Sequence, residues 1–129
     1  MAGIESLSQI MDNDSAENIK EMTDCFVSQF DPLKVILFGS FANGSYDDNS
    51  DYDFYIVVND EDDPWDIRKK ARKAIRNIQK RPVDIVIGTN SHFQKYGSSP
   101  DTLFVEGEVF KKGMLLYDRG NQTVNRRAV

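Results

Sequence analysis

Two apolar runs of strand length flank a segment rich in Gly, Ser and Asp in the first half of the sequence. The runs cover residues 34–38 (KVILF) and 53–58 (DFYIVV), and the segment between them reads GSFANGSYDDNSDY. Short apolar runs bounded by turn-forming residues predict buried strands. The chain must therefore leave one strand through a Gly-Ser turn and enter the next between two aspartates, although Asp is a poor strand former.

The rest of the chain alternates between helical and strand patterns. The further predicted elements are a helix over 14–30 capped by Asp14 or Ser15, a helix from Asp63-Pro64 to Arg81-Pro82, a strand over 83–87, a loop carrying His92, a helix from a cap at 99–101 to about Lys112, and a strand over 114–117. This order predicts an α/β or α+β fold in the broad sense, with a small mixed sheet and helices packed chiefly on one face.

Length and charge limit the classes of protein. With 129 residues the chain is expected to form one domain over residues 1–118, followed by a polar tail over 119–129. The net charge of −5 argues against nucleic acid as the main partner. Cys25 is the single cysteine, and no apolar stretch resembles a secretory or membrane segment, so we expect a cytoplasmic protein without membrane contact.

Three aspartates at strand positions are the strongest chemical signal. Asp51 and Asp53 lie two residues apart at the start of a strand, so their side chains are expected on the same face. Asp84 interrupts the third apolar run, and its carboxylate would join them if that strand lies beside the second. Such carboxylates repel each other, and divalent cations would relieve the repulsion. Hard oxygen ligands suit magnesium or manganese.

The Gly39-Ser40 turn fits the same site. Glycine lets the backbone approach a ligand closely, a strand-to-helix turn leaves amide N–H groups available for phosphate, and Ser40 adds a hydroxyl donor. An anion-binding turn beside metal-binding carboxylates is the arrangement that a metal–nucleoside triphosphate complex requires.

Structural alternatives accompany these interpretations. The segment 47–51 also reads as a solvated turn with Asx-type hydrogen bonds, and Asp84 also reads as an exposed carboxylate on an edge strand. The predicted helix from Pro64 carries a basic surface, which is either a docking face for an acidic partner or nucleic-acid tail, or an ordinary solvated face. His92, Trp65 and Tyr46 are expected to be surface or core residues, and Cys25 a core thiol.

The spacing of these residues resembles a known family. Gly39-Ser40, ten intervening residues and Asp51-Tyr52-Asp53, followed by Asp84, resemble the nucleotidyltransferases of the DNA polymerase beta superfamily, and the ending VEGEVFKKGMLLYD is similar to the stand-alone minimal nucleotidyltransferases. The resemblance implies a polymerase-beta palm-like fold. It also implies that Gly39 and Ser40 contact the triphosphate and that Asp51, Asp53 and Asp84 bind two magnesium ions. Relatives often have arginine where this chain has Asn43.

The same resemblance implies an activity and a partner. The family transfers a nucleoside monophosphate from a triphosphate to a hydroxyl, here AMP from ATP. Minimal nucleotidyltransferases resemble the antitoxins that pair with an all-helical HEPN ribonuclease toxin, which implies adenylylation of a toxin tyrosine within a hetero-oligomer. The alternative is a binding module that neutralises its partner by occlusion alone. Three concentrated carboxylates favour the enzyme, because a pure binder has no need of them.

Overall fold

The protein forms one mixed four-stranded sheet with helices on both sides. The structure is a computed structural model and describes residues 7–100 and 103–120. Its elements are α2 (Asn13–Phe30), β1 (Lys34–Phe38), α3 (Ser40–Asn43), β2 (Tyr52–Val58), α4 (Pro64–Ile75), β3 (Val83–Thr89), α5 (Asn90–Gly97), α6 (Val105–Lys112) and β4 (Met114–Asp118). The strand order is β3-β2-β1-β4. Strand β1 is antiparallel to β2 and β4, whereas β2 and β3 are parallel, which confirms the predicted small mixed sheet.

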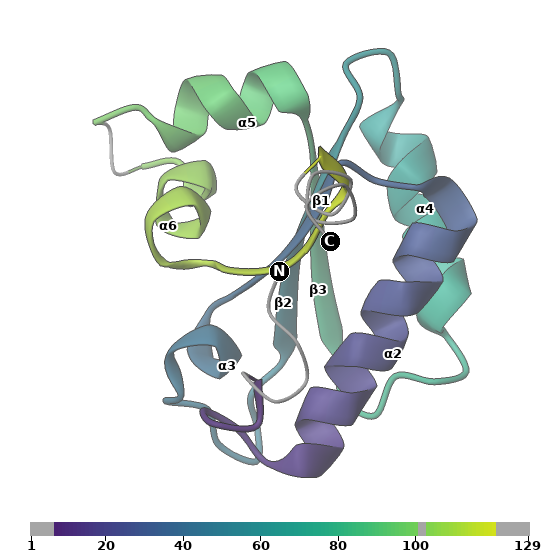
Figure 1. Cartoon of the computed structure of the whole chain (residues 1–129), viewed down its shortest axis with the longest axis vertical. Helices are drawn as coiled ribbons and strands as arrows, with labels where there is room; N and C mark the ends of the chain where they lie inside the picture. The colour runs from purple at the N-terminus through teal and green to yellow at the C-terminus, as the bar shows by residue number, and fades with distance from the viewer. Residues whose placement is uncertain (1–6, 101–102, 121–129) are drawn as a thin grey trace, which may run out of the picture.

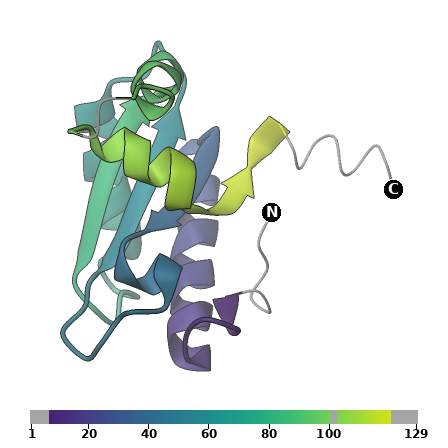
Figure 2. The ribbon, with the colours of Figure 1, turned by 90° about the vertical axis from the view of Figure 1, so that its left-hand side faces the viewer.

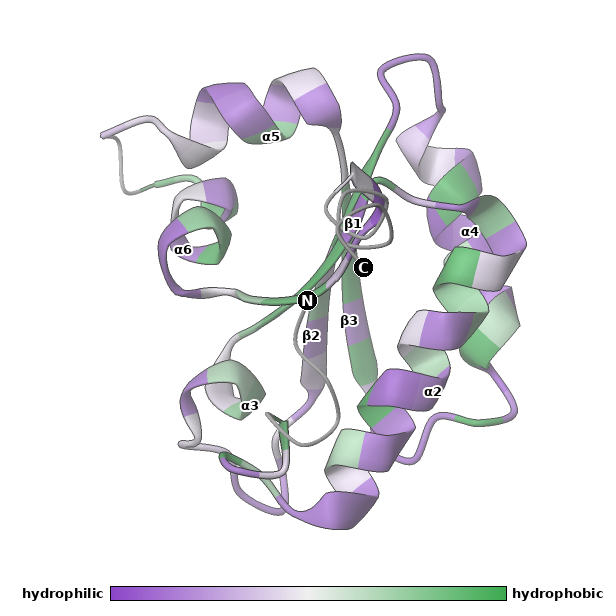
Figure 3. Ribbon diagram, viewed as in Figure 1, coloured by the Kyte–Doolittle hydropathy of each residue, from purple (hydrophilic) through white to green (hydrophobic). Residues whose placement is uncertain are grey.

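Helices cover both faces of the sheet, whereas the sequence pattern predicted them chiefly on one face. The difference arises because β1 and β2 bury apolar side chains on both faces. Figure 1 shows α2 and α4 on one side and α3, α5 and α6 on the other. The α2/α4 side holds the larger core, in which Phe26, Leu37 and Phe54 are fully buried. A smaller core on the opposite side joins the strands to Phe93 of α5 and Val109 of α6. Figure 3 shows hydrophobic residues along the strands and hydrophilic ones over much of α2 and α4.

Successive side chains of β1 and β2 point alternately into these two cores. Phe54 and Ile56 face the α2/α4 side, while Tyr55 and Val57 face the α5/α6 side. This two-residue period places Asp53, at the start of β2, on the α5/α6 side as well.

Helix α2 starts one residue earlier than predicted, and its N-cap lies two to three residues before the predicted cap. The N-cap is Asp12, whose carboxylate accepts hydrogen bonds from the Ser15 backbone N–H at 2.8 Å and from the Ser15 hydroxyl at 3.0 Å. The prediction of Asp14 or Ser15 as the cap was therefore wrong. Ser15 lies inside the helix as the donor, because a cap oxygen reaches N–H groups two or three residues ahead.

Helix α4 ends at Ile75, well before the predicted stop at Arg81-Pro82. Apolar spacing continues to Ile78, but Asn18 of α2 binds the backbone there. Its side chain donates to the Ile78 carbonyl at 2.8 Å and accepts from the Lys80 N–H at 3.0 Å. A buried amide that satisfies these backbone groups stabilises a non-helical connection.

The segment after β3 also differs from the prediction. His92 lies in helix α5 instead of a loop, and Thr89 caps that helix by accepting from the His92 N–H at 3.3 Å. The last helix begins at Val105 instead of a cap at 99–101. Residues 101–102 lie outside the described residues. Helix α5 was not predicted because it has only eight residues and its N-cap, Thr89, is also the last residue of β3.

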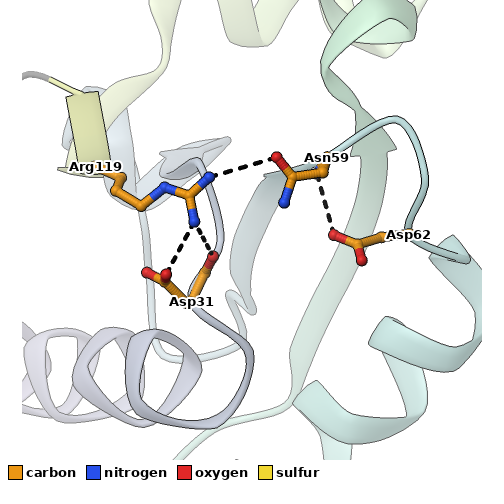
Figure 4. Close-up of polar contacts among 4 residues, drawn as sticks. All are labelled: Asp31, Asn59, Asp62 and Arg119. Carbon is orange, nitrogen blue, oxygen red and sulfur yellow. Dashed lines mark hydrogen bonds and ion pairs between the residues drawn. The ribbon is translucent and has the colours of Figure 1, made fainter.

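Arg119, directly after β4, connects three parts of the chain (Figure 4). Its guanidinium donates to the Asp31 carboxylate at 2.9 Å and to the Asn59 side-chain oxygen at 3.4 Å. Asp31 ends α2 with φ of 45°, and the Asn59 N–H donates to Asp62 at 3.2 Å. The first two residues of the predicted tail, 119 and 120, are described, and the tail from 121 onward lies outside the described residues. None of the helices over 7–100 and 103–120 has the length and apolar character needed to cross a membrane.

Candidate functional site

The sheet brings two of the predicted aspartates to neighbouring positions. Asp53 is paired in register with Asp84 on parallel strand β3 and with Phe38 on antiparallel strand β1. The expectation that the third strand lies beside the second is therefore confirmed. Phe38 is followed directly by Gly39, so the Gly-Ser turn leaves the sheet next to Asp53. Asp51 lies just before β2 and is exposed, as is Asp84.

Gly39 lies against the carboxylate of Asp53. A Cβ atom at this position would lie 2.2 Å from Oδ2 of Asp53, far closer than atoms can approach. The backbone of Gly39 also has φ of 76° and ψ of −156°, a conformation that residues other than glycine rarely adopt. The positive φ favours glycine whatever the available space, and any larger residue would also have to displace the Asp53 carboxylate.

Asp53 is the most electrostatically perturbed carboxylate of the site. Partial burial and the neighbouring charges of Asp84, Asp51 and Glu108 raise its pKa to about 6. Burial is the largest cause, because it disfavours the charged form. A cation at this position would stabilise the ionised carboxylate.

A pocket of about 200 Å³ opens beside the turn. Its lining residues are Phe38, Gly39, Ser40, Asn43, Ser45, Glu108 and Lys112. Glu108 and Lys112 come from α6, which Figure 2 shows crossing the face of the sheet turned toward the viewer, with α3 below it. Sequence reasoning missed both residues, since their only signal was a four-residue spacing on a short helix of unknown placement. The Asn43 side chain accepts from the backbone and hydroxyl of Ser45 at 2.9 and 2.6 Å, so it stabilises the turn locally.

Arg81 fixes the loop that leads into Asp51. Its guanidinium donates to the carbonyls of Asp47 and Ser50 at 2.9 and 3.1 Å and lies 4.9 Å from the ring centroid of Phe41. Within the loop, Asp47 accepts from the Asn49 N–H at 2.9 Å, which is an Asx turn. The turn interpretation therefore holds for Asp47.

The carboxylates suit magnesium chemically without forming a preassembled cage. Within residues 7–100 and 103–120, no group of three or more His, Cys, Asp or Glu side chains is gathered closely enough to hold a metal ion. Magnesium usually binds through one or two carboxylates, several waters and substrate phosphates. The paired Asp53 and Asp84, with the raised pKa of Asp53, are compatible with that mode of binding.

Three other residues singled out in the sequence lie elsewhere. His92 contacts Glu106, with 3.2 Å between Nε2 and Oε2, and Glu106 also accepts from the Tyr55 hydroxyl at 2.7 Å. Trp65 is exposed on α4. Cys25 is partly buried against the main core, and burial raises the pKa of its thiol.

Comparison with known proteins identifies the family. The sequence matches the family described as Polymerase beta, Nucleotidyltransferase over residues 18–122. The match spans most of the chain, which therefore belongs to the polymerase beta nucleotidyltransferase family. No curated protein matches the sequence significantly.

One solved structure supports the fold. The crystal structure of a candidate nucleotidyltransferase from Sulfolobus solfataricus has a TM-score of 0.53 at 22% identity, covering 91% of this chain and 87% of that chain. At this identity the likeness shows the fold alone. A toxin–antitoxin crystal structure with AMP-PNP has a TM-score of 0.48 at 19% identity, covering 81% of this chain and 78% of that chain.

Proposed function

We propose that this protein transfers AMP from ATP to a hydroxyl of a partner protein, namely that of a tyrosine. The observation that carries the proposal is the meeting of Gly39, Asp53 and Asp84 at one end of the sheet, beside a pocket, in a chain of the nucleotidyltransferase family. Phosphoryl-type chemistry requires chiefly positioning and charge compensation, and both are available there.

The roles of the residues are taken from the family resemblance. Asp51 and Asp53 would hold two magnesium ions, Asp84 would share the catalytic one, and Gly39 with Ser40 would contact the triphosphate. Bound magnesium would neutralise the phosphate charge and polarise the reacting phosphorus, and manganese is a chemical alternative. The acceptor oxygen attacks the α-phosphorus, the bond to the β-phosphate oxygen breaks, and pyrophosphate leaves. The hydroxyl proton passes to a nearby carboxylate, for which Asp84 is the exposed candidate.

Two α6 residues extend the proposed site. Lys112 lines the same pocket as Gly39 and Ser40, so its ammonium is available to a phosphate where Asn43 provides no charge. Glu108 adds negative charge near Asp53 and would either bind a metal ion or direct the acceptor hydroxyl.

The partner is proposed from the resemblance of the sequence to minimal nucleotidyltransferases. These are similar to antitoxins of HEPN toxins, so the partner would be a helical ribonuclease toxin within a cytoplasmic hetero-oligomer. The transferase domain would comprise residues 1–118 and the polar tail 119–129. A non-catalytic module that inhibits its partner by occlusion remains the second candidate, favoured by the exposure of two of the three aspartates.

Intact-mass spectrometry tests the proposal. The protein, its partner, ATP and magnesium should yield a partner heavier by one or more AMP units, because positioning a hydroxyl beside a bound triphosphate lowers the barrier by several kcal/mol. Asp51→Asn should abolish the mass shift while the complex persists, and Asp48→Asn in the adjoining loop is the matched control that should retain it. An unmodified but inhibited partner would establish occlusion instead.

A further inference from the structure

A row of basic side chains runs along α4 beside an exposed tryptophan. The row consists of Arg68, Lys69, Arg72, Lys73 and Arg76. Over the described ranges the ion pair that involves α4 is Lys70–Asp66, at 3.2 Å, and it lies outside this row. The row therefore keeps its positive charge on a chain whose net charge is −5.

Two arginines of the row are held in fixed positions by an edge strand. Arg68 Nε donates to the Ile85 carbonyl at 3.0 Å, and Arg72 Nη1 donates to the Val83 carbonyl at 2.5 Å. Strand β3 is at the edge of the sheet. Carbonyl oxygens carry no net charge, so both guanidinium groups remain cationic. Their other N–H groups are oriented in advance for an anionic ligand, which lowers the entropy cost of binding.

The surface beside the row is apolar and contains two pockets. Trp65 is 72% exposed. Two pockets of about 280 Å³ each share Trp65 and Arg68 as lining residues. One runs over the β3 residues Ile85, Val86 and Ile87, and the other follows the basic row to Arg76. Exposed tryptophan and ordered arginine are the residue types that dominate protein–protein interfaces.

We propose that this groove, lined by Trp65 and the basic row, binds an acidic amphipathic segment of a protein partner. An apolar side chain of the segment would lie against Trp65, and its carboxylates would pair with the row. Arg68, Arg72 and Arg76 follow one another at about 6 Å along the helix axis, which is also the spacing of carboxylates four residues apart on a partner helix. That this partner is the AMP acceptor rests on the proposed function.

Charge on the neighbouring helix favours a short acidic segment over a nucleic acid. Helix α2 packs beside α4 and exposes Asp14, Glu17, Glu21 and Asp24. Figure 1 shows the two helices side by side on the same layer. A long polyanion would meet these carboxylates, whereas a segment confined to the row would not.

The groove also leads toward the proposed catalytic end. Arg72 binds the carbonyl of Val83, and the next residue of β3 is Asp84. The Asp84 side chain faces the α5/α6 side, as that of Asp53 does, so a partner held on the α4 side would reach it around the exposed edge of β3.

Fluorescence of Trp65, the single tryptophan of the chain, provides the test. The probe is a capped helical peptide of about 18 residues, five turns long, with Leu on one face and Glu elsewhere. Without ATP, it should shift the Trp65 emission to the blue in a saturable manner. Raising the salt from about 50 to about 300 mM should weaken binding roughly tenfold, because exposed charges are screened. The double variant Lys69→Glu/Lys73→Glu should also lose roughly tenfold or more, since it reverses two charges of the row.

The control variant Lys95→Glu/Lys111→Glu makes the same change in net charge on other exposed residues and should bind the peptide nearly as well as the native chain. The inference is overturned if the peptide causes no shift, if both double variants bind alike, or if an oligouridylate of the same length binds more tightly than the peptide. The titration involves no nucleotide. If the peptide binds but the mass-spectrometric assay shows neither AMP transfer to the partner nor dependence on Asp51, the proposed function is rejected and the groove proposal stands.

Discussion

The two faces of the sheet serve different purposes although the same strands build both. On the α2/α4 face, β2 contributes Phe54 and Ile56 to the larger hydrophobic core. On the α5/α6 face it contributes Asp53 and Tyr55, whose polar groups lie near other carboxylates. One face is therefore optimised for burial, whereas the other carries charge that is costly in the absence of a ligand.

This difference teaches how closely function and stability can alternate along one strand. Asp53 and Phe54 are adjacent, yet the side chains point to opposite faces. Substitutions one residue apart should therefore have opposite consequences, one for activity and the other for stability.

The largest effect is expected on activity at Asp53. Asp53→Asn preserves volume and removes a charge that would bind magnesium, so AMP transfer should fall by about a thousandfold or more. The measurement is the rate of the partner's mass shift, with circular dichroism to establish that the variant is folded. Unchanged transfer would remove Asp53 from the proposed catalytic residues.

The next effect is on stability, one residue further along. Phe54 is fully buried and packs edge-on against Phe26 with 5.3 Å between ring centroids. Phe54→Ala should lower the free energy of unfolding by about 3–5 kcal/mol, because it removes apolar burial and leaves a cavity. Urea denaturation measures this loss. Phe110→Ala, at a half-exposed ring, is the control, and an equal loss there would contradict the contrast between the faces.

A smaller effect is expected at the buried hydrogen bond of the α5/α6 face. Tyr55→Phe removes the donor to Glu106 and should cost about 1–3 kcal/mol, because the carboxylate stays buried with one partner fewer. Thermal or urea unfolding measures the change. Tyr46→Phe, which removes a hydroxyl bonded to exposed Asp12, should cost less. Equal costs would show that burial does not strengthen the Tyr55 contact.

The smallest effect is a pH-dependent gain in stability. The folded-state pKa of Asp53 is about 6, above the ordinary value of 3.8, so the native state binds a proton more readily than the unfolded chain. The stability contributed by this group is complete below about pH 4 and is lost as the pH rises through 6. Without metal, Asp53→Asn should therefore be more stable than the native chain by roughly 1 kcal/mol above pH 7, a value reduced for partial exposure to solvent.

Thermal unfolding in chelator at pH 4 and pH 7.5 tests this, with Asp48→Asn as an exposed control. A gain of equal size at both pH values would mean that it does not arise from the titration of Asp53.

Much of the strand framework could be predicted from local sequence. The run 34–38 is strand β1 as expected, and the starts of β2 and β4 differ by at most one residue from the prediction. These segments were readable because apolar runs between turn residues have few alternatives to burial in a sheet. Gly39, Ser40 and the three aspartates were also visible, because their signal is local spacing within or beside strands.

The helix ends and several residues at the site could not be predicted from local sequence. Helix α4 stops where Asn18, about sixty residues away in the chain, takes over its backbone, and no local pattern encodes that contact. Glu108 and Lys112 reach the pocket only because α6 lies across the sheet. Arg81 was expected to mark the end of a helix, yet its guanidinium fixes the loop before Asp51.

The charged residues, the Gly-Ser turn and the apolar runs can be read from the sequence, since they depend on residue type and on spacing over a few positions. The strand neighbours, and hence the pairing of Asp53 with Asp84 and the contact of Asp53 with Gly39, are set by the folded chain. Strand order and helix placement depend on the joint burial of side chains that are distant in sequence. The raised pKa of Asp53 arises in the same way, because burial and three neighbouring carboxylates act together only in the folded chain.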